Sequence, residues 1–198
     1  MSFAGALDKE SRVELFVFLS FALILVAAVF GLRRRFLSFQ GQQPSEYLGL
    51  GPDLVLHERL SGAMVCDGLV FGPTGRVSSR FRADVRGDWT GREGTVTLDF
   101  AFDSGATQLR EWRLSLGNDG HVAAEADDID GRAKGRIVGP TLRMAYRIRL
   151  PEDAGGHTLS VVDWIYLTEH GVLVNRSQFR KFGITVAELF AVIRPKEG

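Results

Sequence analysis

The chain has 198 residues, and its 24 basic and 24 acidic side chains give a formal net charge of zero. This balance excludes nucleic-acid binding driven by overall positive charge. Cys66 is the single cysteine, so the chain can form no intrachain disulfide and no cysteine-based zinc site. The 23 glycines against 6 prolines, among ordinary apolar content, favour many short strands and turns over disorder.

The first predicted element is a transmembrane helix at residues 13–32. Residues 15–32 carry no charge and span about 27 Å as a helix, which nearly crosses a hydrocarbon core about 30 Å thick. A cleaved signal peptide is the alternative. The apolar run is longer than is usual in such peptides, however, and "VAAVFGLRRR" has no clear A-x-A cleavage site. We therefore expect residues 1–35 to form a retained single-pass anchor, with the lipid bilayer as a partner of the chain.

The orientation of this helix depends on its basic flanks. Lys9 and Arg12 precede the helix, and Arg33, Arg34 and Arg35 follow it. The positive-inside rule favours the side with more basic residues, which would place the large domain in the cytoplasm. The two flanks differ by a single basic residue, so the side of the membrane stays open.

Residues 36–52 are expected to form a linker, because glycine and proline interrupt every periodic run there. From residue 53 onward, alternation with a period of two dominates. It is clearest in the runs "RVSSRFRADVRG", "TVTLDFAFD", "REWRLSLG" and "TLRMAYRIRL". These runs predict half-buried antiparallel strands with one face toward solvent.

The connections between these runs, such as "GDWTGREG", "DSGATQ" and "GNDGH", are too short to hold a crossover helix. About nine or ten strands fit into residues 53–198, which predicts an all-β, antiparallel, up-and-down barrel. A sandwich is the alternative, although closure has the advantage that it removes exposed strand edges. In "GRAKGRIVG", the inward glycines indicate either room for a cavity or a tight bend where another segment approaches closely.

The stretch "DWIYLTEHGVLVNRSQFRKFG" is predicted to be a hairpin with an unusual number of polar residues among aromatic ones. These polar residues are Asp163, Asn175, Arg176, Arg180 and Lys181. A buried charge is costly unless it is paired, so we predict that Asp163 pairs with one of the three cations and that Trp164 is buried. The cluster would act either as a structural plug that fixes the register or as a polar contact for an apolar ligand.

Asp127 and Asp128 are adjacent, and adjacent strand residues point to opposite faces. At most one of them faces inward, where Arg110 or Arg176 could pair with it. The candidate ligand-binding residues or polar cluster are therefore Arg110, Trp112, Asp128, Asp163, Trp164, Asn175, Arg176, Arg180 and Lys181.

The sequence contains no G-x-S-x-G elbow, no HExxH motif and no phosphate-binding loop. His121, His157 and His170 lie beside glycines in predicted turns, and Cys66 is expected to be a buried structural residue. We therefore expect a protein that is not an enzyme and that has no cofactor and no bound metal.

Several segments resemble the bacterial family DUF3833, whose members are often described as lipoproteins. The resemblance rests on "FRADVRGDWTGREGTVTLDFAFDSG", "REWRLSL", "AEADDIDGRAKG" and "DWIYLTEHGVLVNRSQFRKFGITVAE", and it covers roughly residues 52–195. It implies a lipocalin-like barrel and a location in the bacterial envelope, on the periplasmic side, but no established activity. Two features depart from the family: the chain reads Val162-Asp163-Trp164-Ile165 where Asp-Asp-Trp-Met is common, and it lacks the lipoprotein cysteine.

The sequence supports two functions from different classes. In the first, a barrel held at the bacterial inner membrane binds a lipid or another hydrophobic small molecule. In the second, the barrel is a structural module that docks a partner protein at the membrane. That second function depends on arginines of the outer face gathering in one place, namely Arg80, Arg82, Arg143, Arg147 and Arg149.

Overall fold

The computed structural model describes residues 9–152 and 155–196. Parts of the predicted anchor segment 1–35 and of the predicted barrel domain 53–198 fall at residues 1–8, 153–154 and 197–198 and lie outside the described residues. The chain divides into two compact units, Met1–Gln43 and Pro44–Gly198. The barrel unit therefore begins within the segment that the sequence suggested as a linker.

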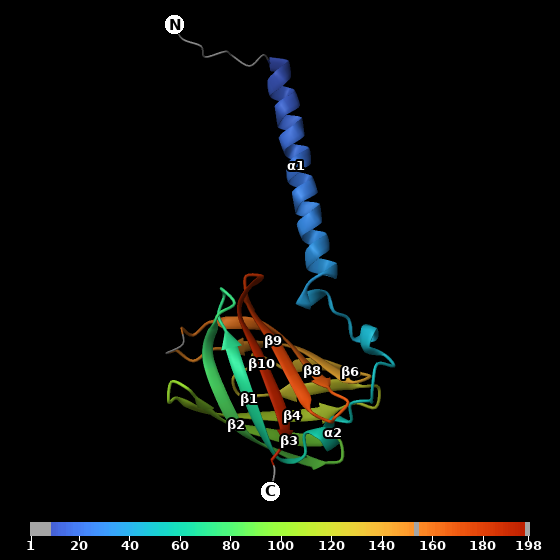
Figure 1. The fold of residues 1–198 in the computed structure, drawn as a ribbon, viewed down its shortest axis with the longest axis vertical. Helices are drawn as coiled ribbons and strands as arrows, with labels where there is room; N and C mark the ends of the chain where they lie inside the picture. Colours follow the sequence, from blue (N-terminus) through green and yellow to red (C-terminus); the bar gives the residue numbers. More distant parts are fainter. Residues whose placement is uncertain (1–8, 153–154, 197–198) are drawn as a thin grey trace. The chain divides into compact units, whose positions relative to one another are not determined.

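The first unit contains α1 (Lys9–Phe36), followed by the short 3-10 helix η1 (Phe39–Gly41) (Figure 1). Within α1, the 23 residues Ser11–Arg33 have a mean hydropathy of 2.9, and none of this span is buried. By length and composition it could cross a bilayer, and a signal sequence would meet the same criteria. The helix is longer than the predicted 13–32, because it continues into the charged residues on both sides.

The second unit is a closed antiparallel barrel of ten strands (Figure 1). The strands are β1 (Gly62–Phe71), β2 (Val77–Thr90), β3 (Glu93–Phe102), β4 (Thr107–Leu116), β5 (His121–Glu125), β6 (Ala133–Val138), β7 (Thr141–Arg149), β8 (Thr158–Leu167), β9 (Leu173–Lys181) and β10 (Ile184–Pro195). Consecutive strands pair with each other, and β1 pairs with β10 to close the ring. The predicted barrel is confirmed, and the alternative of a sandwich is wrong.

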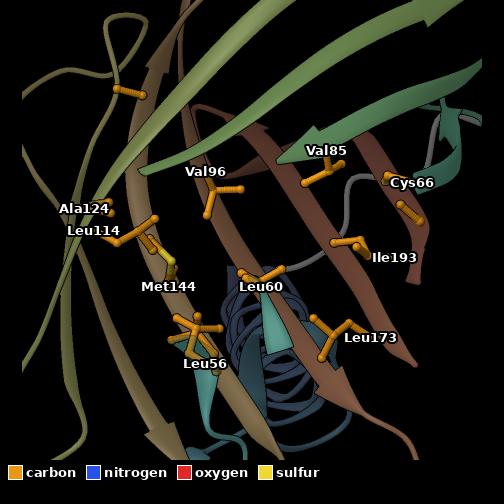
Figure 2. Close-up of a cluster of buried hydrophobic side chains, with 14 of the residues drawn as sticks. Leu56, Leu60, Cys66, Val85, Val96, Leu114, Ala124, Met144, Leu173 and Ile193 are labelled. Carbon is orange, nitrogen blue, oxygen red and sulfur yellow. The ribbon is translucent and has the colours of Figure 1, made fainter. Parts of the chain in front are cut away.

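Apolar side chains at every second position of the strands fill the interior. In β2, Phe81, Ala83 and Val85 are buried, whereas Arg82 and Asp84 between them are exposed. The same pattern on the other strands builds one hydrophobic core, part of which is drawn in Figure 2. The period of two in the sequence therefore corresponds directly to the inner and outer faces of the barrel.

A short segment closes one end of the barrel. It contains α2 (Leu56–Arg59), and its leucines at positions 54, 56 and 60 are buried in the core. Figure 2 shows Leu56 and Leu60 among side chains that project from the strands. The backbone N–H of Leu54 donates to the carbonyl oxygen of Gly139 at 2.9 Å, and Nε1 of Trp89 donates to the carbonyl oxygen of Leu60 at 2.8 Å. The segment is thus fixed to both sides of this end.

A second segment crosses the outer face of the barrel. The 3-10 helix η2 (Pro44–Tyr47) brings the Tyr47 ring to 5.3 Å from the Trp164 ring, and Tyr166 stacks on Trp164 at 5.8 Å. Trp164 is buried, as predicted, but on the outer face, where Tyr47 and Tyr166 cover it. A Cβ at Gly139 would lie 2.2 Å from the carbonyl oxygen of Tyr47, so this glycine serves close approach and not a cavity.

The arginines of the outer face do not gather in one patch. Arg80 and Arg82 lie on β2, and the other three arginines proposed for a docking face lie on β7. In the barrel, β1, β10, β9 and β8 separate these two strands on one side. Arg80 lies 3.6 Å from Asp103, and Arg147 lies 3.5 Å from Asp130. The expected single docking face is therefore wrong, because the strand order places its two halves apart.

We predict that Gly87→Ala lowers the free energy of unfolding by about 1–3 kcal/mol, because a Cβ at this position would lie 1.7 Å from the carbonyl oxygen of Leu60. Chemical denaturation of the full-length protein in detergent measures this change. The matched control is Gly72→Ala, whose Cβ would have its nearest neighbours at 3.9 Å, so its midpoint should stay close to that of the wild type. Equal effects of the two substitutions would contradict the role assigned to the 54–60 segment.

Candidate ligand-binding site

The barrel interior contains a cavity of about 130 Å³. Every strand except β5 and β6 contributes to its lining, and most of the lining is apolar or aromatic. Leu60 lines the cavity from the end that α2 closes. Toward the opposite end, Phe100, Phe179 and Arg110 keep accessible surface, and among the described residues of the second unit no helix covers that end. We call this the open end; it carries the turns β1–β2, β3–β4, β5–β6, β7–β8 and β9–β10.

A carboxylate lies inside this apolar lining. Asp163 of β8 points into the cavity, and its Oδ1 accepts a hydrogen bond from Ser177 Oγ at 2.7 Å and another from Asn175 Nδ2. Asn175 also donates to the carbonyl oxygen of Trp164 at 3.1 Å. Among the described residues, no hydrogen bond reaches the second oxygen of Asp163, Oδ2. A group that enters the cavity with a hydrogen-bond donor can therefore bind this oxygen.

Burial raises the pKa of the Asp163 carboxyl above its usual value of 3.8. The hydrogen bonds from Ser177 and Asn175 and the charge of Arg110 act in the opposite direction and only partly offset this effect. The low dielectric of the interior disfavours the ionised form more than these partners favour it. The site therefore holds its proton more tightly than a solvated aspartate does.

Arg110 of β4 lies nearer the open end of the cavity. Its guanidinium carbon lies 4.4 Å from the centre of the Trp112 ring and 5.9 Å from that of Tyr146, and its Nε lies 3.0 Å from Asp128 Oδ2. Arg110 and Asp128 keep 16% and 23% of their side-chain surface exposed. Burial raises the pKa of the Tyr146 hydroxyl, and the nearby charge of Asp163 adds to this effect. A cation held between two aromatic rings thus forms the outer part of the polar lining.

The structure separates the predicted site residues into two groups. Arg110, Trp112, Asp163 and Asn175 line the cavity, and Asp128 reaches it through its ion pair with Arg110. The prediction that Arg110 could pair with one of the two adjacent aspartates is confirmed for Asp128. Asp127 instead pairs with Arg113 at 2.9 Å, and its side chain is 91% exposed.

The remaining predicted residues do not reach the cavity. The predicted pairing of Asp163 with a cation of its own hairpin is wrong, because the outward faces of β9 and its turn carry all three cations. Arg176 pairs with Glu188 of β10 at 3.3 Å, Arg180 donates to the carbonyl oxygen of Gly183, and Lys181 lies beside the Phe182 ring. The neutral side chains of Ser177 and Asn175 donate to Oδ1 of Asp163 instead.

The sequence-based candidates did not include two residues with hydroxyl groups that the structure places in the lining, Ser177 and Tyr146. Strand alternation places Ser177 on the same face as Asn175. Tyr146 shares the inward face of β7 with Met144 and Leu142, so the signal was present there too. A single serine or tyrosine on a strand is common in structural positions, so the residue type alone does not indicate a binding site.

Within the part of the chain that the structure describes, the interior holds neither a cluster of metal ligands nor an ionised thiol. Among the described residues, no three His, Cys, Asp or Glu side chains come together to hold a metal ion. Cys66 also lines the cavity, and burial raises the pKa of its thiol to about 12. This thiol stays protonated at neutral pH, which makes it a poor nucleophile.

Comparison with solved structures agrees with this architecture. The S-type phycobiliprotein lyase CpeS from Guillardia theta is similar with a TM-score of 0.52 at 5% sequence identity, covering 72% of this chain and 91% of that protein. A protein described as exported, with a YmcC-like fold, from Bacteroides fragilis has a TM-score of 0.34 at 11% identity, covering 75% of this chain and 98% of that one. The first similarity shows the fold alone, and the second is too low to carry an argument. No curated protein sequence matches the chain.

The fold and the cavity define a lipocalin-like barrel with a small, mainly apolar interior site. At the level of sequence, residues 35–195 match the family DUF3833, which is described as proteins of unknown function. The chain belongs to this family. The resemblance in the sequence is thereby confirmed, and the match covers the whole barrel together with the segments that precede it.

We predict that Asp128→Ala lowers the free energy of unfolding by about 1–3 kcal/mol, because it leaves the largely buried Arg110 without its ion-pair partner. Asp127→Ala is the matched control. It removes a neighbouring carboxylate that is almost fully exposed, and it should change stability by less than about 0.5 kcal/mol. Thermal and chemical denaturation measure both. A similar loss for the two variants would mean that the Arg110–Asp128 pair contributes nothing specific.

A second prediction concerns pH. Because the Asp163 pKa is raised in the folded chain, the stability that its carboxyl contributes is fully present below about pH 4 and is lost as the pH rises through the folded-state pKa. Asp163→Asn removes this dependence. The stability of the variant relative to the wild type should therefore increase between about pH 4 and pH 8.

Asp84→Asn is the control for this pH dependence. A hydrogen bond from Lys196 lowers the Asp84 pKa, so its contribution is lost only as the pH falls below the usual value of 3.8. The stability difference of this variant should be flat above about pH 5. Denaturation curves across the pH range test both variants, and a flat difference for Asp163→Asn would show that the carboxyl is solvated.

Proposed function

We propose that the protein binds a hydrophobic small molecule, or one chain of a lipid, inside the barrel and that it acts as a binding protein, not as an enzyme. The observation that carries this proposal is a mainly apolar cavity in which Oδ2 of Asp163 accepts no hydrogen bond from the described residues. A ligand site typically combines an apolar lining with a few placed polar groups.

The size of the cavity limits the ligand. Its volume of about 130 Å³ is close to that of an engineered cavity of about 150 Å³ that binds benzene. The enclosed part of a ligand is therefore one ring or a short alkyl segment. A longer molecule extends past Arg110 through the open end, where an ion pair and two aromatic rings can contact its remainder.

The chemistry of the lining suggests how the ligand is oriented. Asp163 would accept a hydrogen bond from a hydroxyl, amide or amine group at the inner end of the ligand, and the aromatic residues would contact its apolar body. The same polar cluster also fixes β8 against β9. A structural role and a binding role therefore involve the same residues, and stability alone does not separate them.

We propose further that α1 is a retained anchor in a bacterial inner membrane. The span Ser11–Arg33 supports this through its length and its mean hydropathy of 2.9. An anchored barrel would meet apolar ligands where they are concentrated, in the bilayer.

The test is to fill the cavity without disturbing its polar groups. Ala191 of β10 lines the cavity opposite Asn175 and is 2% exposed, so Ala191→Leu adds side-chain volume where the ligand would lie. We expect native mass spectrometry of the full-length protein in detergent to show a co-purifying apolar adduct in the wild type. In Ala191→Leu, its occupancy should fall at least about tenfold.

Ala101→Leu is the matched control, because it makes the same change on the exposed outer face of β3. This variant should keep the adduct, which separates loss of the cavity from a general effect of an added leucine. An adduct that persists unchanged in Ala191→Leu, or a wild type that carries none, would contradict the proposed function.

A further inference from the structure

The turn between β9 and β10 carries the residue with the least favourable backbone in the barrel. Phe182 has φ of 50°, and among the described residues it is the one non-glycine residue with positive φ. Gly183 follows with φ of 80°. Two consecutive residues with positive φ form the hairpin turn in which Asn-Gly is the favoured pair, because the left-handed region is sterically poor for a bulky side chain.

Phe182 is also almost fully exposed. Its relative exposure is 94%, and Ile184 beside it is 69% exposed. The ammonium group of its neighbour Lys181 lies 5.7 Å from the centre of the Phe182 ring. Beyond this contact, folding gains little from an aromatic residue here, since neither the backbone conformation nor packing favours it. A strained residue without a structural reason points to a function.

Two neighbouring hairpins carry basic residues near their tips and no acidic ones. The β9–β10 hairpin carries Arg180 and Lys181 near its tip, and the sequence from Gly171 to Ala187 contains no acidic residue. The β1–β2 hairpin carries Arg76 at its tip, and no acidic residue occurs between residues 68 and 83. Because β1 pairs with β10, both tips project from the same part of the open end, as Figure 1 shows.

We infer that the tip of the β9–β10 hairpin, residues 181–184, inserts into the surface of an anionic lipid bilayer. Phe182 and Ile184 would enter the boundary between headgroups and acyl chains, and Lys181 would lie at the level of the lipid phosphates. Exposed aromatic and aliphatic side chains beside cations are the combination that binds such an interface. Anionic headgroups would repel carboxylates on either hairpin, and residues 68–83 and 171–187 contain none.

This contact gives the proposed function a route for its ligand, and to that extent it rests on that function. The hairpin projects at the open end of the cavity, where Phe179 of β9 lines the interior two residues before Lys181. An apolar molecule could then pass between bilayer and cavity along the inner face of β9 without crossing bulk water.

The experiment uses the full-length chain reconstituted into vesicles. Phe182→Cys is labelled with the environment-sensitive fluorophore NBD, and Cys66, at 3% exposure, serves as the labelling blank in the wild type. The vesicles contain phosphatidylcholine alone or phosphatidylcholine with phosphatidylglycerol, each with a spin-labelled lipid as quencher. The matched control is His170→Cys, an exposed position in the turn at the other end of β9.

We expect a blue shift and lipid-dependent quenching of NBD at residue 182, stronger with phosphatidylglycerol than without it. NBD at residue 170 should stay in water. Adding Lys181→Gln to the labelled chain should lower the ratio of inserted to free tip about five-fold, the effect of one basic residue near an anionic surface.

Two results would overturn the inference. One is a label at residue 182 that stays in water in both kinds of vesicle. The other is a blue shift that depends on protein concentration without quenching by lipid, which would identify a second protein chain as the occupant of the tip.

The two proposals fail separately in these experiments. An empty cavity in native mass spectrometry together with a quenched label would remove the proposed ligand and leave the membrane contact standing. An adduct in the cavity with an unquenched label would do the reverse.

Discussion

The pairing of β1 with β10 is the interaction on which the rest of this structure depends. It joins strands from opposite ends of the barrel sequence, with Cys66 opposite Ile193, and it leaves no open edge in the sheet. In a closed sheet, every second side chain points into an enclosed volume. An inward polar group must therefore find its hydrogen-bond partner there or remain unsatisfied. The hydrogen bonds of Ser177 and Asn175 to Asp163 follow from this requirement.

Closure also explains why the interior is not fully packed. Ala191 is a small inward residue of the lining, and the larger residues around it do not fill the remaining space completely. Protein interiors are normally packed as densely as organic crystals, so a cavity beside a carboxylate is unusual. Empty cavities in proteins are typically apolar, whereas this cavity exposes a carboxylate acceptor. A polar group that enters it, from a ligand or an ordered water, can pair with that acceptor.

Much of the fold could be predicted from the sequence, because alternation with a period of two reports directly on the two faces of a strand. The expectation that Arg110 or Arg176 pairs with one of the two adjacent aspartates also holds for Arg110 and Asp128, although both aspartates lie in the turn between β5 and β6, where strand alternation does not apply. Alternation could not tell which face of β8 and β9 was inside, since both faces carry aromatic and polar residues. The large apolar side chain of Trp164 favoured the inner face. Tyr47, far away in the sequence, covers it from outside instead. A local sequence pattern cannot predict such long-range packing. The cations of the β9 hairpin were misplaced for the same reason.

The cover over Trp164 has a mechanical consequence. Tyr47 follows the end of α1 at Phe36 by eleven residues, and it packs on the outer face of β8. Tension applied to the chain from its N-terminal side therefore reaches β8 before it reaches β1, whose pairing closes the ring. β8 is hydrogen-bonded along its length to both β7 and β9, so two ladders resist displacement of this strand. The seam between β1 and β10 therefore lies away from the point at which the preceding chain first packs on the sheet.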